Sequence, residues 1–129
     1  MIQINKIHHI AIICTDYQKS KKFYTSILGL TIIQEIYREE RQSYKLDLAL
    51  NGEFCVELFS FPDPPQRPST PEAAGMRHLA FEVNDIQKTH ERLVGQHTTP
   101  EDIRMDEFTH KKFFFIADPD NLPIEFYEK

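Results

Sequence analysis

Residues 9–20 read HIAIICTDYQKS, and this stretch returns 69 residues later, at residues 78–89, as HLAFEVNDIQKT. His, Ala, Asp, Gln and Lys recur at matching positions, and most other positions exchange residues of similar shape or polarity. A match of this kind within one short chain indicates an internal repeat, which has to be identified before any fold is assigned.

The composition is that of an ordinary soluble domain. The chain has 129 residues, of which 40% are hydrophobic and 27% charged, and its length fits a single domain with its own core. A net charge of −5 lacks the basic excess that a nucleic-acid-binding surface requires. The apolar runs are far shorter than the ~20 residues that span a bilayer, and the N-terminus lacks a signal-peptide core. We therefore expect a cytoplasmic protein whose partners include neither nucleic acid nor membrane.

Each copy of the repeat predicts a strand followed by a helix. The expected strands cover residues 7–14 and 76–83, and each is followed by an aspartate that suits the N-cap of a helix. Helical patterns follow at residues 17–28 and 86–94, with Gly29 and Gly95 as their C-terminal stops. The expected apolar stripes of these two helices are Phe23, Ile27 and Leu28 in the first, and Ile86, Leu93 and Val94 in the second.

Three further strands follow in each half. They are expected at residues 30–38, 44–50 and 53–61, and again at 97–105, 111–117 and 122–127. Asn51-Gly52 is a two-residue hairpin turn, and the proline-dense residues 62–75 form a linker. The sequence thus predicts one α+β domain over residues 1–129. Two βαβββ modules, residues 5–61 and 76–129, would form a curved mixed sheet, or cup, with the helices outside.

Side chains alternate between the two faces of a strand, so each opening strand has an apolar face and a face that carries a histidine. In the first strand His9, Ala11 and Ile13 share a face, and in the repeat His78 shares a face with Ala80. We expect the apolar face to lie under the helix. His9 and His78 would then lie on the opposite face, and a pseudo-twofold between the modules would bring them together.

The last strand of each half carries a glutamate among apolar residues. Glu57 lies 48 residues after His9, and Glu125 lies 47 residues after His78. A carboxylate inside an apolar strand is costly unless it is paired or binds a metal. Two imidazoles, two carboxylates and two waters would give an octahedral site suited to Ni²⁺, Co²⁺, Mn²⁺ or Fe²⁺, and less well to Zn²⁺. The repeat therefore predicts one divalent transition metal bound by His9, Glu57, His78 and Glu125.

Each of these residues taken alone has an ordinary structural role as its alternative, because lone strand histidines and glutamates are usually core or surface residues. The metal site is favoured because four residues agree in type and position. His8 is expected to point to the opposite face from His9 and so to take no part. Basic side chains that could anchor an anionic substrate, if they are not simply solvated, are Arg38, Arg41, Lys45, Arg104, Lys111 and Lys112.

Five segments carry a resemblance to a known family. They are HHIAI at 8–12, FYTSILGL at 23–30, VELF at 56–59, RHLAFEV at 77–83 and DPDNLPIEFYE at 118–128. With these segments the chain resembles, over its whole length, the vicinal oxygen chelate superfamily. This superfamily includes glyoxalase I, methylmalonyl-CoA epimerase, fosfomycin resistance proteins, extradiol dioxygenases and bleomycin-binding proteins. The chain is most similar to its short, glyoxalase I-like bacterial members.

The resemblance implies a cup around one metal, with His9, Glu57, His78 and Glu125 as ligands. It also implies a homodimer, and in some members of the superfamily each site is built from two chains. The four-ligand set is typical of isomerases and lyases, whereas the dioxygenases use two His and one Glu, and the bleomycin-binding members lack the ligands. In the shared mechanism a substrate with two neighbouring oxygens replaces the metal waters, and Glu125 or Glu57 removes a proton beside the carbonyl.

Three functions stay open at this point. The first is a lactoylglutathione lyase-like lyase or isomerase that acts on a small molecule, such as the hemithioacetal of methylglyoxal and a thiol. The second is a divalent-metal dioxygenase or a thiol transferase that confers antibiotic resistance. The third is a non-catalytic protein that binds a small ligand. Residues 37–41 (YREER), residues 106–112 (DEFTHKK) and the proline-rich linker depart from glyoxalase I, so glutathione is not assigned as a cofactor.

Overall fold

The computed structural model describes residues 1–129 and divides into two compact units, Met1–Gln66 and Arg67–Lys129. Each unit contains one copy of the repeat folded as a βαβββ module. The boundary falls inside the proline-rich segment. No helix of the chain has the length and apolar character needed to cross a bilayer.

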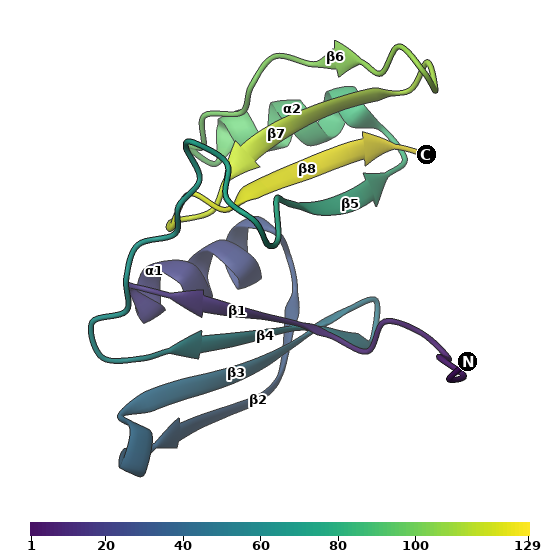
Figure 1. The fold of residues 1–129 in the computed structure, drawn as a ribbon. Coiled ribbons are helices and arrows are strands. Elements are labelled where there is room, and N and C mark those ends of the chain that lie inside the picture. The colour runs from purple at the N-terminus through teal and green to yellow at the C-terminus, as the bar shows by residue number, and fades with distance from the viewer. The chain divides into compact units, whose positions relative to one another are not determined.

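The first unit is built on a four-stranded mixed sheet with the strand order β1-β4-β3-β2 (Figure 1). β1 pairs in parallel with β4, whereas β3 runs antiparallel to both β4 and β2. The strands are β1 (Ile10–Cys14), β2 (Thr31–Arg38), β3 (Ser43–Leu50) and β4 (Glu53–Ser60). Between β1 and β2 lie α1 (Tyr17–Lys22) and a π-helical turn (Phe23–Ile27), and a 3₁₀ turn (Glu39–Arg41) joins β2 to β3.

The two faces of this sheet differ as the alternation predicts. One face lies against α1 and contains the buried side chains Ile12, Cys14, Leu46, Leu48, Val56 and Leu58. Ile13, on the other face, is 55% exposed. Because a directly paired residue lies on the same face as its partner, Ala11 and Glu57 share the face that α1 does not cover. His9 lies on this side too, because its Nε2 is 3.9 Å from Glu57 Oε1.

The helical segment of the first unit is capped as expected, but its buried stripe differs. Asp16 accepts a hydrogen bond from the Lys19 amide, and Gly29 has a left-handed φ of 80° that ends the segment. Of the predicted stripe only Phe23 is fully buried, while Ile27 and Leu28 are half-buried. The remaining buried positions are Tyr17, Ser20 and Tyr24.

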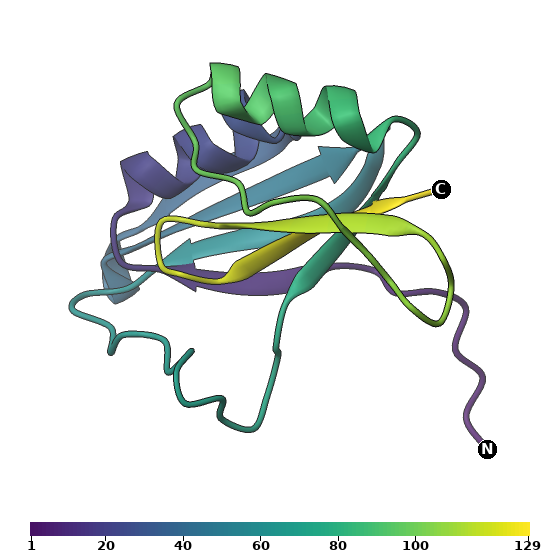
Figure 2. The same cartoon turned by 90° about the horizontal axis from the view of Figure 1, so that it is seen from above.

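The second unit repeats the plan with the strand order β5-β8-β7-β6. β5 (Leu79–Val83) pairs in parallel with β8 (Pro123–Glu128), and β7 (Lys112–Ala117) runs antiparallel to β8 and to β6. The helix α2 (Ile86–Gly95) lies along β7 and β8 of its own sheet (Figure 2). Its sheet buries Phe114, Ile116, Ile124 and Phe126.

Three predictions in the second unit are wrong in detail. The long strand expected at 97–105 shrinks to β6 (Arg104–Met105), because Pro100 cannot donate to a ladder. Gly95 is the last helical residue rather than the stop, and the left-handed residue after α2 is His97, with φ 60°. Val94 is 52% exposed, so only Ile86 and Leu93 of the expected stripe are buried.

The proline-rich segment is ordered by side-chain contacts after Gln66. The Arg67 guanidinium donates to Ser69 Oγ at 2.8 Å and to the carbonyls of Met76 at 2.8 Å and Arg77 at 3.1 Å. Ser69 Oγ in turn donates to the carbonyl of Asn121 at 3.0 Å. Residues 67–77 are therefore fastened to the second unit. The predicted fold class, α+β with two βαβββ modules, is confirmed.

Candidate metal centre

Both candidate histidines lie one residue before the first strand of their module. β1 begins at Ile10 and β5 at Leu79, so the strands are shorter at their N-termini than the sequence predicts. The parallel ladders place Ala11 opposite Glu57 and Ala80 opposite Glu125. In each module the residue paired with the glutamate is therefore an alanine, two positions after the histidine. Its small side chain leaves room for the imidazole and the carboxylate to approach each other.

The histidine and the glutamate of each module approach each other. His78 Nε2 lies 3.0 Å from Glu125 Oε2, and His9 Nε2 lies 3.9 Å from Glu57 Oε1. Both glutamate side chains are only 14% exposed. Neighbouring ligand atoms about 2.1 Å from an octahedral ion are about 3.0 Å apart, so the spacing in the second module suits two adjacent ligands. The pair in the first module is somewhat wider.

The surroundings of His78 and Glu125 also fit a metal. His78 is the only basic group within ion-pair distance of the Glu125 carboxylate. Phe115 packs edge-on against the His78 ring, with the ring centres 5.3 Å apart, and His78 Nδ1 is buried without a hydrogen-bond partner. Packing therefore sets the ring orientation and leaves Nε2 facing the carboxylate. The structure gathers no group of three or more His, Cys, Asp or Glu side chains that could hold a metal ion. Each module supplies one His–Glu pair, which is two of the four predicted ligands.

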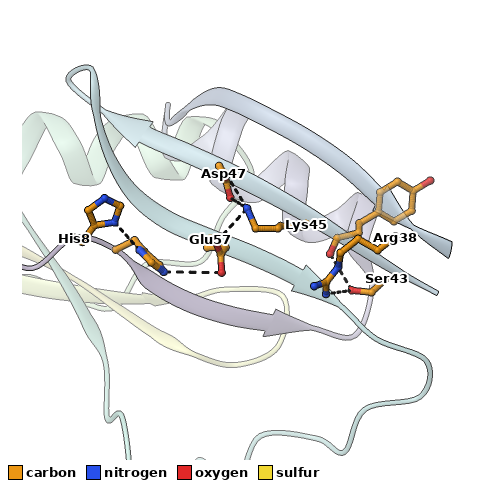
Figure 3. A network of polar contacts seen from close by, with 8 residues as sticks. His8, Arg38, Ser43, Lys45, Asp47 and Glu57 are labelled. Carbon is orange, nitrogen blue, oxygen red and sulfur yellow. Dashed lines mark hydrogen bonds and ion pairs between the residues drawn. The ribbon is translucent and has the colours of Figure 1, made fainter. Parts of the chain in front are cut away.

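The first module adds a polar network that the second lacks (Figure 3). Lys45 Nζ lies 3.3 Å from Glu57 Oε2 and donates to both oxygens of Asp47, at 2.8 and 2.9 Å. The Asp47 carboxylate, and after it that of Glu57, raises the pKa of Lys45 above its usual value. In the second module the residue opposite Glu125 is Phe115, and no ammonium group is present there. The two glutamates therefore have different electrostatic surroundings.

His8 does not point away from His9, as the alternation rule predicts. The two Nδ1 atoms lie 2.8 Å apart, and both rings contact Phe54. The prediction fails because both residues precede the strand ladder, where side chains need not alternate. The contact leaves His9 Nε2 facing Glu57. Sequence reasoning missed this contact between His8 and His9, and the only signal for it is the adjacency of the two histidines.

Two of the candidate basic anchors pack on phenylalanine rings. Arg38 lies over Phe59, and Arg104 lies over Phe113, each with Cζ 4.9 Å from the ring centre. Arg104 also helps to line an open pocket of about 420 Å³ in the second unit that includes Glu125. Of the remaining candidates, Lys111 Nζ donates to the carbonyl of Lys129 at 2.7 Å, and Arg41 and Lys112 are exposed.

Comparison with known proteins settles the family. Residues 6–126 match the Glyoxalase/Bleomycin resistance protein/Dioxygenase superfamily. The chain belongs to this superfamily. It is 58% identical to the uncharacterised protein YwkD of Bacillus subtilis (strain 168), with 98% of each chain covered. It is 55% identical to the uncharacterised protein YaeR of Escherichia coli (strain K12) over the full length of both.

Solved structures agree with this assignment. The glyoxalase family protein from Enterococcus faecalis is 44% identical and superposes with a TM-score of 0.89, covering 95% of this chain and 97% of that one. More distant superfamily structures share the fold alone. They include the fosfomycin resistance protein FosX of Listeria monocytogenes, at 17% identity and a TM-score of 0.75, which covers 97% of this chain and 93% of that one.

Proposed function

We propose that this protein is a metal-dependent, glyoxalase I-like lyase or isomerase that abstracts a proton next to the carbonyl of a small substrate. His9, Glu57, His78 and Glu125 would bind one divalent transition metal, drawn from Ni, Co, Mn, Fe or Zn. The observation that carries the proposal is the pairing, in each module, of one His with one Glu on the sheet face that the helix does not cover. The homodimer implied by the family belongs to the same proposal.

The donor set and one structural relative support the metal. Two imidazoles and two carboxylates balance a divalent charge and suit a borderline transition metal. The FosX protein, which has the same fold, has been determined in complex with Mn(II) and a dihydroxypropylphosphonic acid, so the fold accommodates a divalent ion in at least one protein. When bound, such an ion would supply a Lewis acid for the substrate carbonyl.

The two glutamates suit different tasks in proton transfer. Glu125 has no lysine or arginine within ion-pair distance and stands beside Phe115, so its carboxylate is the better general base. It would take the proton from the carbon beside the carbonyl and return it to the neighbouring carbon. Glu57 Oε2 lies 3.3 Å from the Lys45 ammonium, so one of its oxygens already has a cationic partner. Glu57 therefore suits a fixed ligand.

The first experiment measures bound metal. The protein is purified without chelator, and its metal content is determined by plasma mass spectrometry for the wild type and for His78→Ala. His97→Asn is the matched control, because it removes an exposed imidazole and asparagine tolerates the left-handed backbone at that position. We expect one equivalent of metal in the wild type and the control, and a loss in His78→Ala. A wild type that neither holds nor takes up metal would overturn the proposal and favour a non-catalytic binding protein.

A second experiment tests the reaction class. Solvent deuterium exchange into the hemithioacetal of methylglyoxal and glutathione is followed with Ni²⁺, Co²⁺, Mn²⁺ and Zn²⁺ added in turn. We expect Glu125→Gln to slow exchange by roughly 10²- to 10⁴-fold, the usual contribution of a positioned base. Glu57→Gln at full metal loading should lose less. Equal losses in both variants would contradict the separate roles given to the two glutamates.

A further inference from the structure

Arg38 is held in one orientation on the sheet face that carries Glu57. It is the last residue of β2, and its Cζ lies 4.9 Å from the Phe59 ring centre and 5.8 Å from that of Phe61. Its Nη2 donates to Ser43 Oγ at 3.0 Å, and Ser43 is completely buried. Ring stacking and a buried hydroxyl thus restrain the guanidinium before any ligand arrives, which reduces the entropy lost on binding.

The positive charge of Arg38 has no counter-ion in the chain. No carboxylate lies within 4.0 Å of it, although Glu39 and Glu40 follow directly, and its Nε is buried without a hydrogen-bond partner. A buried donor without an acceptor is a cost that native structures usually avoid. An oxyanion at the guanidinium would supply the missing counter-charge.

The other cations near the candidate ligands are already neutralised. Lys45 is shared between Asp47 and Glu57, and Arg104 lies 3.1 Å from Glu101. Figure 3 shows Arg38 and Ser43 at one part of the sheet face, apart from the cluster of Lys45, Asp47 and Glu57. Arg38 is therefore the cation on this face that remains available to a ligand.

The spacing of residues along β4 gives the approximate distance between the Arg38 guanidinium and Glu57. Phe59, under the guanidinium, lies two residues from Glu57 on β4 and on the same face. Two residues of a strand span about 6.6 Å. A molecule that contacts both the Arg38 guanidinium and Glu57 therefore needs several ångströms between its anionic group and the atoms that reach Glu57. A chain of a few carbon atoms spans this distance.

We propose that Arg38 is the anchor for the anionic end of the substrate. The substrate is then a small organic acid with a carboxylate or phosphate at one end. A few carbon atoms separate this group from a pair of neighbouring oxygens at the other end. The requirement for two neighbouring oxygens depends on the proposed metal function. The requirement for an anionic end depends on Arg38 alone, so each of these two parts of the proposal can be wrong without the other.

The test uses three probes that share an α-hydroxycarboxylate and differ at the far end. 2-Hydroxyvalerate ends in a methyl group, 2-hydroxyglutarate in a carboxylate and 3-phosphoglycerate in a phosphate. Each is titrated calorimetrically into Mn²⁺-loaded and metal-free protein, as wild type, Arg38→Gln and Arg38→Lys. Arg41→Gln is the matched control, because Arg41 is an exposed arginine of the adjoining turn.

We expect the wild type to bind at least one of the two probes with an anionic far end roughly 10- to 100-fold more tightly than 2-hydroxyvalerate, as a hydrogen bond to a charged group warrants. Arg38→Gln should reduce this ratio to about one, Arg38→Lys should retain part of it, and Arg41→Gln should leave it unchanged. Whether the carboxylate or the phosphate probe is preferred identifies the anionic group. Circular dichroism of each variant checks that the fold is intact.

The outcomes separate the anchor from the proposed function. A wild type that takes up metal but does not distinguish the probes, or an Arg38→Gln variant that still does, overturns the anchor and leaves the metal function standing. A chain that binds no metal, but whose preference for the probes with an anionic far end is lost in Arg38→Gln, supports the anchor and overturns the metal function.

Discussion

Asp47 and Glu57 are direct partners across the β3–β4 ladder, and Lys45 binds both carboxylates. Two like charges facing each other on one side of a sheet repel, so the ammonium is what keeps this pair stable. The corresponding partner of Glu125 is Phe115. The two His–Glu pairs, one in each module, thus match in residue type but differ in the charge of their surroundings.

This relationship predicts the effect of Lys45→Met. Removing one positive charge about 6 Å from a divalent ion in water is worth about 1.4 kcal/mol, or about tenfold in affinity. We therefore expect Mn²⁺ to bind about tenfold more tightly by calorimetric titration. The metal-free variant should unfold at lower urea, because Asp47 and Glu57 lose their shared cation. Lys22→Met, an exposed change on α1, should alter neither quantity. Unchanged or weaker Mn²⁺ binding in Lys45→Met would contradict this account of the network.

The contact between His8 and His9 predicts a supporting role for His8. A hydrogen bond to Nδ1 fixes the tautomer and the ring orientation of a histidine that binds metal through Nε2, and its loss typically costs 10- to 100-fold in metal affinity. We expect His8→Ala to weaken Mn²⁺ binding by about tenfold. His8→Phe retains a ring against Phe54 but cannot hydrogen-bond, and it should behave like His8→Ala. If His8→Phe binds Mn²⁺ as the wild type does, ring packing is the only contribution of His8.

The link between α1 and β2 predicts a pH-dependent contribution to stability. Glu35 accepts hydrogen bonds from Lys21 Nζ at 2.7 Å and from the Tyr17 hydroxyl. The Lys21 ammonium, followed by the Tyr17 hydroxyl, holds the pKa of Glu35 below its ordinary value of 4.5. A carboxylate with a lowered folded-state pKa stabilises the fold above its unfolded pKa and loses this contribution as the pH falls through the folded value.

Glu35→Gln should therefore destabilise the protein by roughly 0.5–1 kcal/mol at pH 7, since the pair is partly exposed. The difference from wild type should shrink as the pH falls below about 4.5, the unfolded-state value. Urea unfolding at pH 7 and pH 3.5 measures both values. Glu40→Gln, at an exposed turn position, should show no difference at either pH. A destabilisation of Glu35→Gln that persists undiminished at pH 3.5 would show that charge is not its source.

The sequence predicts the fold well wherever local signals are strong. The repeat, the aspartate caps, Gly29 and the Asn51-Gly52 turn each identify an element boundary that the structure confirms. Prediction fails where a pattern is weak or tertiary packing decides. The weak pattern of residues 97–105, interrupted by Pro100, does not show that only Arg104 and Met105 form strand, and nothing local distinguishes exposed Val94 from buried Leu93.

The structure brings together the His and the Glu that the repeat singles out in each module, but the surroundings of these pairs could not be predicted. The Asn51-Gly52 turn alone would set Leu46 opposite Glu57, because Leu50 pairs with Glu53 and the register would continue unchanged from there. An irregularity between Leu48 and Ala49 shifts the register by one residue and brings Asp47 there instead. No sequence signal marks this bulge, so the Lys45 network could not have been predicted. The metal assignment itself stays a prediction.

The chain contains two copies of one module with matching His–Glu pairs and different neighbours, which makes it a natural subject for protein engineering. The positions beside Glu57 are Asp47 and Lys45, whereas those beside Glu125 are aromatic. Each copy can be redesigned at these flanking positions while the histidine and glutamate stay untouched. Exchanging Phe115 for aspartate together with Phe113 for lysine would give the second copy the charges of the first, and the reverse exchange would make the first copy apolar. In such a duplicated scaffold one copy serves as the internal control for the other when the effect of neighbouring side chains on the reactivity of a carboxylate is measured.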